Sequence, residues 1–205
     1  MRSIRSLCGA IALIGLGAPA FAENPMLKAD FWKGADLAKV KAAVEAGNSA
    51  SETDKDLYSP LYNALLAGTT LDVVEYLVER GADVHTPGYD NLSPLMLAAR
   101  YNKLDVVDFI LSKEPDLAYQ DDSWRDALQF ACLRQDDPAV YQRLMDLGMD
   151  ISIPDIQGRN CALSVAYLNP SVSALDYVAT LDDITAEDNN GNNLLMQAAM
   201  RNPVL

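Results

Sequence analysis

Histidine and cysteine are scarce in this sequence, which has one histidine, His85, and three cysteines among 205 residues. These side chains supply most metal ligands in proteins and many of the bases and nucleophiles of enzymes. Cys132, Cys161 and His85 form no close-spaced ligand set, and no serine or cysteine nucleophile motif lies beside His85. The glycines stand singly, so a glycine-rich phosphate loop is missing too. We therefore expect no enzyme, no metal and no other cofactor, and a turn role for His85.

Basic residues are also few, with 16 lysines and arginines against 29 aspartates and glutamates and a formal net charge of −13. Contacts to phosphates dominate nucleic-acid affinity, so an acidic chain without a basic stripe argues against nucleic acid as a partner. Acidic pairs such as Asp121-Asp122 are expected to be solvated loop faces. A partner protein with a basic surface would be steered toward this chain.

Long hydrophobic runs are missing as well. The first apolar run, Leu7–Leu16, is too short to cross a bilayer as a helix, and no later run is long enough either. Arg2 and Arg5 precede this run, and small residues at alternate positions follow it up to Ala22. The order predicts a signal peptide over residues 1–22, and hence a soluble exported protein of a bacterial periplasm without membrane insertion after cleavage. A eukaryotic secretory route and a buried cap helix are the alternatives.

The sequence does contain a repeated string. Residues 59–64 read Ser-Pro-Leu-Tyr-Asn-Ala, residues 93–98 read Ser-Pro-Leu-Met-Leu-Ala, and looser copies surround Leu128, Leu163 and Leu195. The leucines of these strings recur every 32 to 35 residues. A fixed period of this size is typical of stacked repeats in which each unit is one supersecondary element.

Each repeat has signals for two helices. In the second repeat Ser93 is an expected N-cap, and Pro94 follows in the first turn, where a missing N–H does no harm. Residues 104–111 then place apolar side chains at helical spacing. In the first repeat Gly81 fits the left-handed position that ends a helix. The sequence therefore predicts helix-turn-helix units.

These strings resemble the Thr-Pro-Leu-His-x-Ala signature of the ankyrin repeat family. The resemblance implies an all-α ankyrin-repeat solenoid of helix-turn-helix units joined by β-hairpin-like loops. It also implies an N-terminal capping repeat over residues 23–56 and ankyrin repeats over 57–205, the last one incomplete. Leu57 and Trp124 stand where the family usually has a loop glycine, and Asp126 replaces its threonine, so the hairpin geometry is left open there.

Two cysteines, Cys132 and Cys161, would remain after signal cleavage in a compartment that permits disulfides. In repeat register Cys132 lies deep in the first helix of its repeat, while Cys161 starts the equivalent helix of the next repeat. A disulfide requires α-carbons about 4.4–6.8 Å apart, and this offset exceeds one helical turn. We therefore expect two buried free thiols, with a disulfide as the alternative.

The resemblance implies a non-enzymatic protein that binds another protein through its concave face. The signal-bearing, acidic chain also resembles small exported ankyrin repeat proteins of proteobacteria, some of which support catalase and some of which are immunity proteins. Two alternatives follow, an immunity protein that neutralises a secreted toxin and an accessory factor for a periplasmic oxidoreductase such as catalase. Haem ligation by His85 or a tyrosine has no motif to support it.

The candidate partner-binding residues lie in the predicted hairpins and at the exposed ends of the first helices. Tyrosine, tryptophan and arginine are enriched at binding hot spots, and they gather in the middle repeats. The alternative is that Tyr101 and Trp124 pack only within their own loops. The full set is Tyr58, Tyr89, Asp90, Leu92, Arg100, Tyr101, Asp122, Trp124, Arg125 and Arg134.

Overall fold

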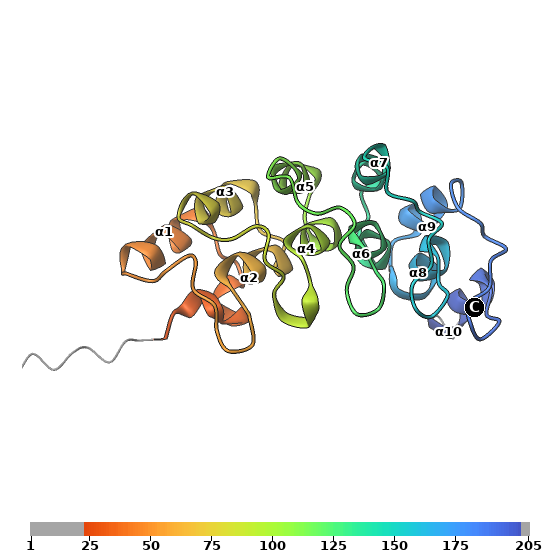
Figure 1. Ribbon diagram of the computed structural model, residues 1–205, viewed down its shortest axis with the longest axis horizontal. Helices are drawn as coiled ribbons and strands as arrows, with labels where there is room; N and C mark the ends of the chain where they lie inside the picture. Colours follow the sequence, from red (N-terminus) through yellow and green to blue (C-terminus); the bar gives the residue numbers. More distant parts are fainter. Residues whose placement is uncertain (1–22, 202–205) are drawn as a thin grey trace, which may run out of the picture.

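The computed structural model describes residues 23–201, and the predicted signal peptide, residues 1–22, lies outside them. Within this range the helices stack in two rows, with no β-strand (Figure 1). The first row contains α2 (Pro60–Leu66), α4 (Pro94–Tyr101), α6 (Ala127–Arg134), α8 (Cys161–Leu168) and α10 (Leu194–Arg201). The second row contains α1 (Leu37–Glu45), α3 (Leu71–Glu79), α5 (Leu104–Leu111), α7 (Pro138–Asp146) and α9 (Val172–Val178). The predicted all-α solenoid of helix pairs is therefore confirmed.

The helices of the first row begin where their capping residues predict. The side chains of Ser59, Ser93, Asp126 and Asn160 each accept a hydrogen bond from the backbone N–H three residues later. These bonds satisfy donors that have no partner inside the helix. Asp126 thus caps α6 in the place of the family's usual threonine.

Burial differs between the two rows. In α4 every residue from Pro94 to Ala99 is buried, because this helix is covered by α2, by α6 and by its own partner α5. In α5 the buried residues are Val106, Val107 and Ile110, which share one face. A helix that is apolar all round belongs inside a fold, whereas an apolar stripe belongs to its surface. The core therefore runs along the first row.

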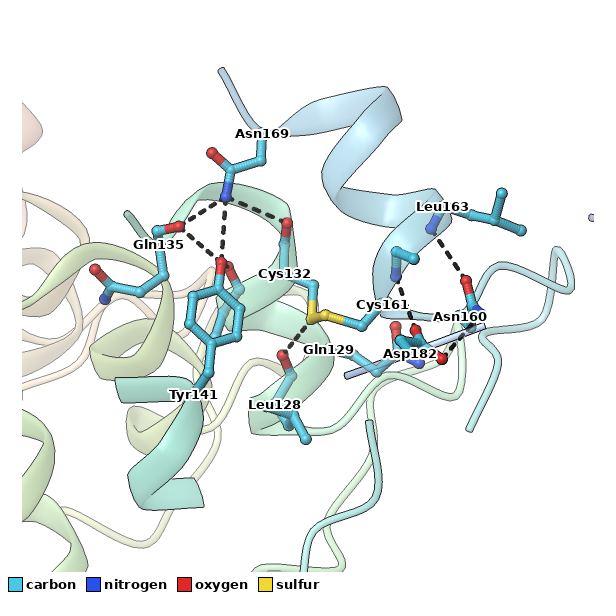
Figure 2. The surroundings of a disulfide bond; sticks show 12 residues. Leu128, Gln129, Cys132, Gln135, Tyr141, Asn160, Cys161, Leu163, Asn169 and Asp182 are labelled. Atoms are coloured by element: carbon cyan, nitrogen blue, oxygen red, sulfur yellow. Dashed lines mark hydrogen bonds between the residues drawn. A yellow bond between two sulfur atoms is a disulfide. The ribbon is translucent and has the colours of Figure 1, made fainter. Parts of the chain in front are cut away.

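Polar side chains link the repeats at the C-terminal ends of the first-row helices. Asn102 donates to the Thr69 carbonyl at 3.1 Å, and Gln135 donates to the carbonyls of Ala99 and Asn102 at 2.9 Å. Asn169 continues the series by donating to the Gln135 carbonyl at 2.8 Å (Figure 2). Each amide satisfies carbonyls of the preceding repeat that the helix end leaves open, which fixes the register between repeats.

Five hairpin loops precede the first-row helices and share one closing hydrogen bond and one left-handed position. In each loop the first N–H bonds to the fifth carbonyl, in residues 54–58, 88–92, 121–125, 155–159 and 188–192. The fourth residue of each loop has positive φ, including Leu57 at 64° and Trp124 at 63°. These two residues therefore adopt the conformation for which the family usually has glycine, and the hairpin geometry is retained.

The first unit, within residues 23–56, begins differently from the later repeats. Two short 3-10 helices, η1 (Pro25–Leu27) and η2 (Ala29–Trp32), stand where each later repeat has its first-row helix. The indole N–H of Trp32 donates to the Met26 carbonyl at 2.8 Å, and both side chains are buried. Because the Met26 carbonyl accepts this bond, it is not part of a regular helical hydrogen-bond series, and the indole ring covers this end of the core.

The expectation of two free thiols is wrong, because Cys132 and Cys161 form a disulfide between α6 and α8 (Figure 2). Their α-carbons lie 5.4 Å apart, within the range that a disulfide requires. The first residue of α8 thus lies beside the second turn of α6. Repeat register compares positions along the chain, whereas this distance depends on how the two helices cross.

Candidate functional site

The candidate binding residues fall into two groups in the structure. The hairpin cluster lies in and beside the loops that precede α2, α4 and α6, and it comprises Tyr58, Tyr89, Asp90, Leu92, Asp122, Trp124 and Arg125. The helix-end groove lies at the other end of the first-row helices and contains Arg100, Tyr101 and Arg134. The sequence analysis placed both groups together on the concave face, whereas the structure places them at opposite ends of the first-row helices.

The tyrosines of the hairpin cluster are held by their neighbours. The rings of Tyr58 and Tyr89 stack with centres 4.9 Å apart, and Tyr62 meets Tyr58 edge-on at 5.2 Å. The Tyr62 hydroxyl also donates to the Tyr89 carbonyl at 3.4 Å. Desolvation raises the pKa of Tyr58 and Tyr62, so both are neutral. This aromatic group is therefore fixed in place, while 41% of Tyr89 stays exposed.

The second and third hairpins are linked, and Trp124 protrudes from them. Asn91 donates to the Asp122 carboxylate at 2.9 Å, which joins the two loop tips. Trp124 is 59% exposed and makes no aromatic or cation–π contact with the described residues. More than half of this side chain is therefore open to contact with a partner. A large side chain at positive φ carries conformational strain, and such strain is concentrated at functional sites.

Two members of the hairpin cluster have structural contacts. Arg125 forms a two-pronged ion pair with buried Asp121, with Nε to Oδ2 at 2.9 Å, and its guanidinium lies 4.8 Å from the centre of the Phe130 ring. Leu92 packs against the core. Both side chains thus stabilise the loops, and only part of each is exposed for contact with a partner.

The helix-end groove is an open cavity of about 630 Å³. Its walls come from four repeats and comprise Leu66, Ala67, Gly68, Arg100, Tyr101, Arg134, Gln135, Asp136, Pro170 and Ser171. The guanidiniums of Arg100 and Arg134 lie 5.0 and 5.7 Å from the centre of the Tyr101 ring. Desolvation lowers the pKa of Arg100, whose buried Nε has no hydrogen-bond partner among the described residues. The groove therefore concentrates positive charge in an acidic chain.

Sequence reasoning missed two residues that shape these surfaces. Leu57 occupies the same strained loop position as Trp124 and is 53% exposed. Gly68 lines the groove, and a Cβ there would lie 2.8 Å from the Tyr101 carbonyl oxygen, so only glycine fits without a shift. A non-glycine residue at a loop glycine position was the available signal for Leu57. Nothing in the local sequence pointed to the close approach at Gly68.

The described residues gather no metal-ligand group of three or more histidine, cysteine or acidic side chains. His85 is exposed, and its backbone N–H donates to the Asp83 carboxylate at 2.8 Å within a turn. No helix between residues 23 and 201 has the length and apolar content needed to cross a membrane.

Comparison with known proteins identifies the repeats. Residues 26–121 match the model for ankyrin repeats in three copies. A putative palmitoyltransferase ZDHHC13 of Danio rerio is 29% identical over 157 residues, which are 69% of this chain and 24% of that protein. Palmitoyltransferase AKR1 of Lachancea kluyveri is 30% identical over 163 residues, 76% of this chain and 22% of that protein. Alpha-latrocrustotoxin-Lt1a of Latrodectus tredecimguttatus is 38% identical over 65 residues, 31% of this chain and 4% of the toxin.

These matches cover no more than about a quarter of each relative. The helix pairs α6–α7 and α8–α9 lie beyond the residues that match the ankyrin model and continue the same stack. Residues 26–121 of this chain are thus ankyrin repeats, and the helix pairs that follow extend their stack.

Proposed function

We propose that this chain is an exported, non-enzymatic binding module that holds another protein against its hairpin cluster and helix-end groove. Ankyrin repeats serve in binding to other proteins, and a solenoid offers an extended surface that is ordered before association. The observation that carries the proposal is Trp124, a large exposed aromatic side chain kept in a strained left-handed conformation. Tryptophan is among the residues most enriched at binding hot spots.

An arginine of each surface contacts the same buried ring. Arg125 of the hairpin cluster and Arg100 of the groove lie 4.8 and 5.8 Å from the centre of the Phe130 ring. The hairpin cluster and the groove therefore lie on the same helices, and we expect one partner to cover both. The same geometry would serve an immunity protein or an oxidoreductase accessory factor, which differ only in the partner.

Replacement of the loop tryptophan tests the proposal. Trp124→Gly is expected to weaken binding of a captured partner by about 2 kcal/mol, the size of a hot-spot loss. Glycine adopts the same left-handed conformation without the cost of about 1–2 kcal/mol that a non-glycine residue has there. The melting temperature of the variant should therefore stay the same or rise. Calorimetry of binding and of unfolding measures both effects.

Two further variants sharpen this test. Leu57→Gly makes the same backbone change in the first hairpin and should show the same thermal behaviour. Leu147→Ala removes an exposed apolar side chain at the end of α7 and should leave binding unchanged. Equal binding by Trp124→Gly and the unchanged chain would show that the partner does not use the hairpin cluster.

Export is tested by the mass of the secreted chain. The signal peptide over residues 1–22 predicts a mature protein that begins at Glu23. Intact mass spectrometry of the periplasmic fraction should find this form. A full-length chain that stays in the cytoplasm would contradict the proposed location.

A further inference from the structure

We propose that the helix-end groove binds the carboxylates of an acidic segment of the partner protein. This inference rests on the proposed binding function and adds the chemistry that the groove recognises. A partner with a basic surface is the expectation from net charge alone, so the inference reverses that expectation for this part of the surface.

Two guanidiniums flank one aromatic ring in the groove. Arg100 lies on α4 and Arg134 at the end of α6, at 5.0 and 5.7 Å from the centre of the Tyr101 ring. Cation–π attraction of this kind holds the two guanidiniums beside the ring. A planar guanidinium carries several N–H donors and suits a two-oxygen acceptor, which is the geometry of a carboxylate.

The two groove arginines differ from those that pair within the chain. Arg125, Arg143 and Arg159 each pair with an aspartate, at 2.5, 2.6 and 2.7 Å. Neither Arg100 nor Arg134 pairs with a carboxylate of the described residues, although the chain has 29 acidic residues. Two positive charges without an internal ion pair therefore share one cavity.

The buried Nε of Arg100 points to the same ligand. This donor has no hydrogen-bond partner among the described residues, and burial lowers the pKa of its guanidinium. A carboxylate bound at the groove side of this guanidinium would supply the opposite charge, which favours the charged form that burial disfavours.

The size and surroundings of the groove favour a protein segment over a small anion. A cavity of about 630 Å³ holds several side chains, and Leu66 and Pro170 contribute apolar wall. An arginine of the groove and one of the hairpin cluster also contact the same Phe130 ring. Asp136 lines the groove without pairing with either arginine, so its negative charge repels a carboxylate. Removal of this charge therefore gives the opposite test to removal of an arginine.

Isothermal titration with an amidated oligoglutamate peptide tests the inference, with oligolysine of equal length as the opposite charge. The unchanged chain should bind oligoglutamate through the groove, whereas any binding of oligolysine to the acidic surface should not be weakened by Arg134→Gln. Arg134→Gln should weaken oligoglutamate binding about tenfold, as expected when a charged hydrogen bond is lost. Asp136→Asn should strengthen it, because a like charge is removed.

The control is Arg80→Gln. Arg80 also stacks on a tyrosine, 4.9 Å from the centre of the Tyr76 ring, but it lies in the second row at the end of α3. This variant should bind oligoglutamate as the unchanged chain does. Equal losses for Arg80→Gln and Arg134→Gln would mean that the peptide senses only overall charge, and the inference would be wrong.

Either of two further results would overturn the inference. If free glutamate bound as tightly as the peptide, the ligand of the groove would be a small carboxylate and not an acidic protein segment. A captured partner that is weakened by Trp124→Gly and unaffected by Arg134→Gln would leave the proposed function standing and overturn this inference alone. The melting temperature of each variant shows whether it is folded. Arg100→Lys is a second variant, which keeps the positive charge but loses the two-pronged geometry of the guanidinium. It should also bind oligoglutamate more weakly.

Discussion

Reduction of the Cys132–Cys161 disulfide is expected to lower the free energy of unfolding by about 3–4 kcal/mol, because the bond closes a loop and restricts the unfolded chain. The two cysteines are 29 positions apart, which sets the size of that loop. The bond joins α6 to α8, so its loss should loosen the C-terminal repeats first. Urea unfolding with and without dithiothreitol measures the difference.

The double variant Cys132→Ala with Cys161→Ala is the control for this prediction. Its stability should not respond to dithiothreitol, since both sulfur atoms are gone. Alkylation of the denatured, unreduced wild-type chain should label neither cysteine. Labelling of both would show that the thiols are free, and the predicted response to the reductant would then be absent.

Asp155→Ala is expected to destabilise the chain by about 3 kcal/mol, because it leaves a largely buried arginine without its partner. The Asp155 carboxylate accepts hydrogen bonds from Nε and Nη2 of Arg159 at 3.0 and 2.7 Å, and from the backbone N–H of Gln157 and Arg159. Only 13% of the Arg159 side chain is exposed. The variant therefore loses an ion pair and the bonds that shape the fourth hairpin, and chemical denaturation measures the loss.

Asp150→Ala is the matched control. Asp150 also accepts a backbone N–H two residues on, that of Ser152, but it is exposed and has no arginine partner among the described residues. Its loss should destabilise by less than about 1 kcal/mol. In the double variant Asp155→Ala with Arg159→Met the unpaired charge is removed, so part of the stability should return. Equal losses for Asp150→Ala and Asp155→Ala would contradict the role assigned to the ion pair.

The hairpins show how far local signals reach. Glycine at residues 158 and 191 predicts the left-handed position of the last two loops, because glycine adopts positive φ without strain. Leu57 and Trp124 adopt the same conformation with no such signal. Hydrogen bonds within each loop accompany this conformation, and the bonds between neighbouring loops, such as that of Asn91 to Asp122, form only in the stacked array.

The candidate site divides in the same way. Residue types and repeat positions selected both Arg125 and Arg134 as surface arginines. Arg125 pairs with Asp121 inside its own hairpin, whereas Arg134 lies in the groove without an ion pair to the described residues. The groove is lined by four repeats, so no single repeat contains enough of it for a local pattern to reveal it.

The sequence by itself determined the repeat period, the helix starts and the order of the helix pairs. These features depend on residues close together in the chain, such as Ser93 and Pro94 at a helix start, and local backbone chemistry decides them. The tertiary structure alone decided the Cys132–Cys161 bond and the placement of two arginines around Tyr101. Both depend on distances between separate helices, which are set by how side chains pack when the repeats stack.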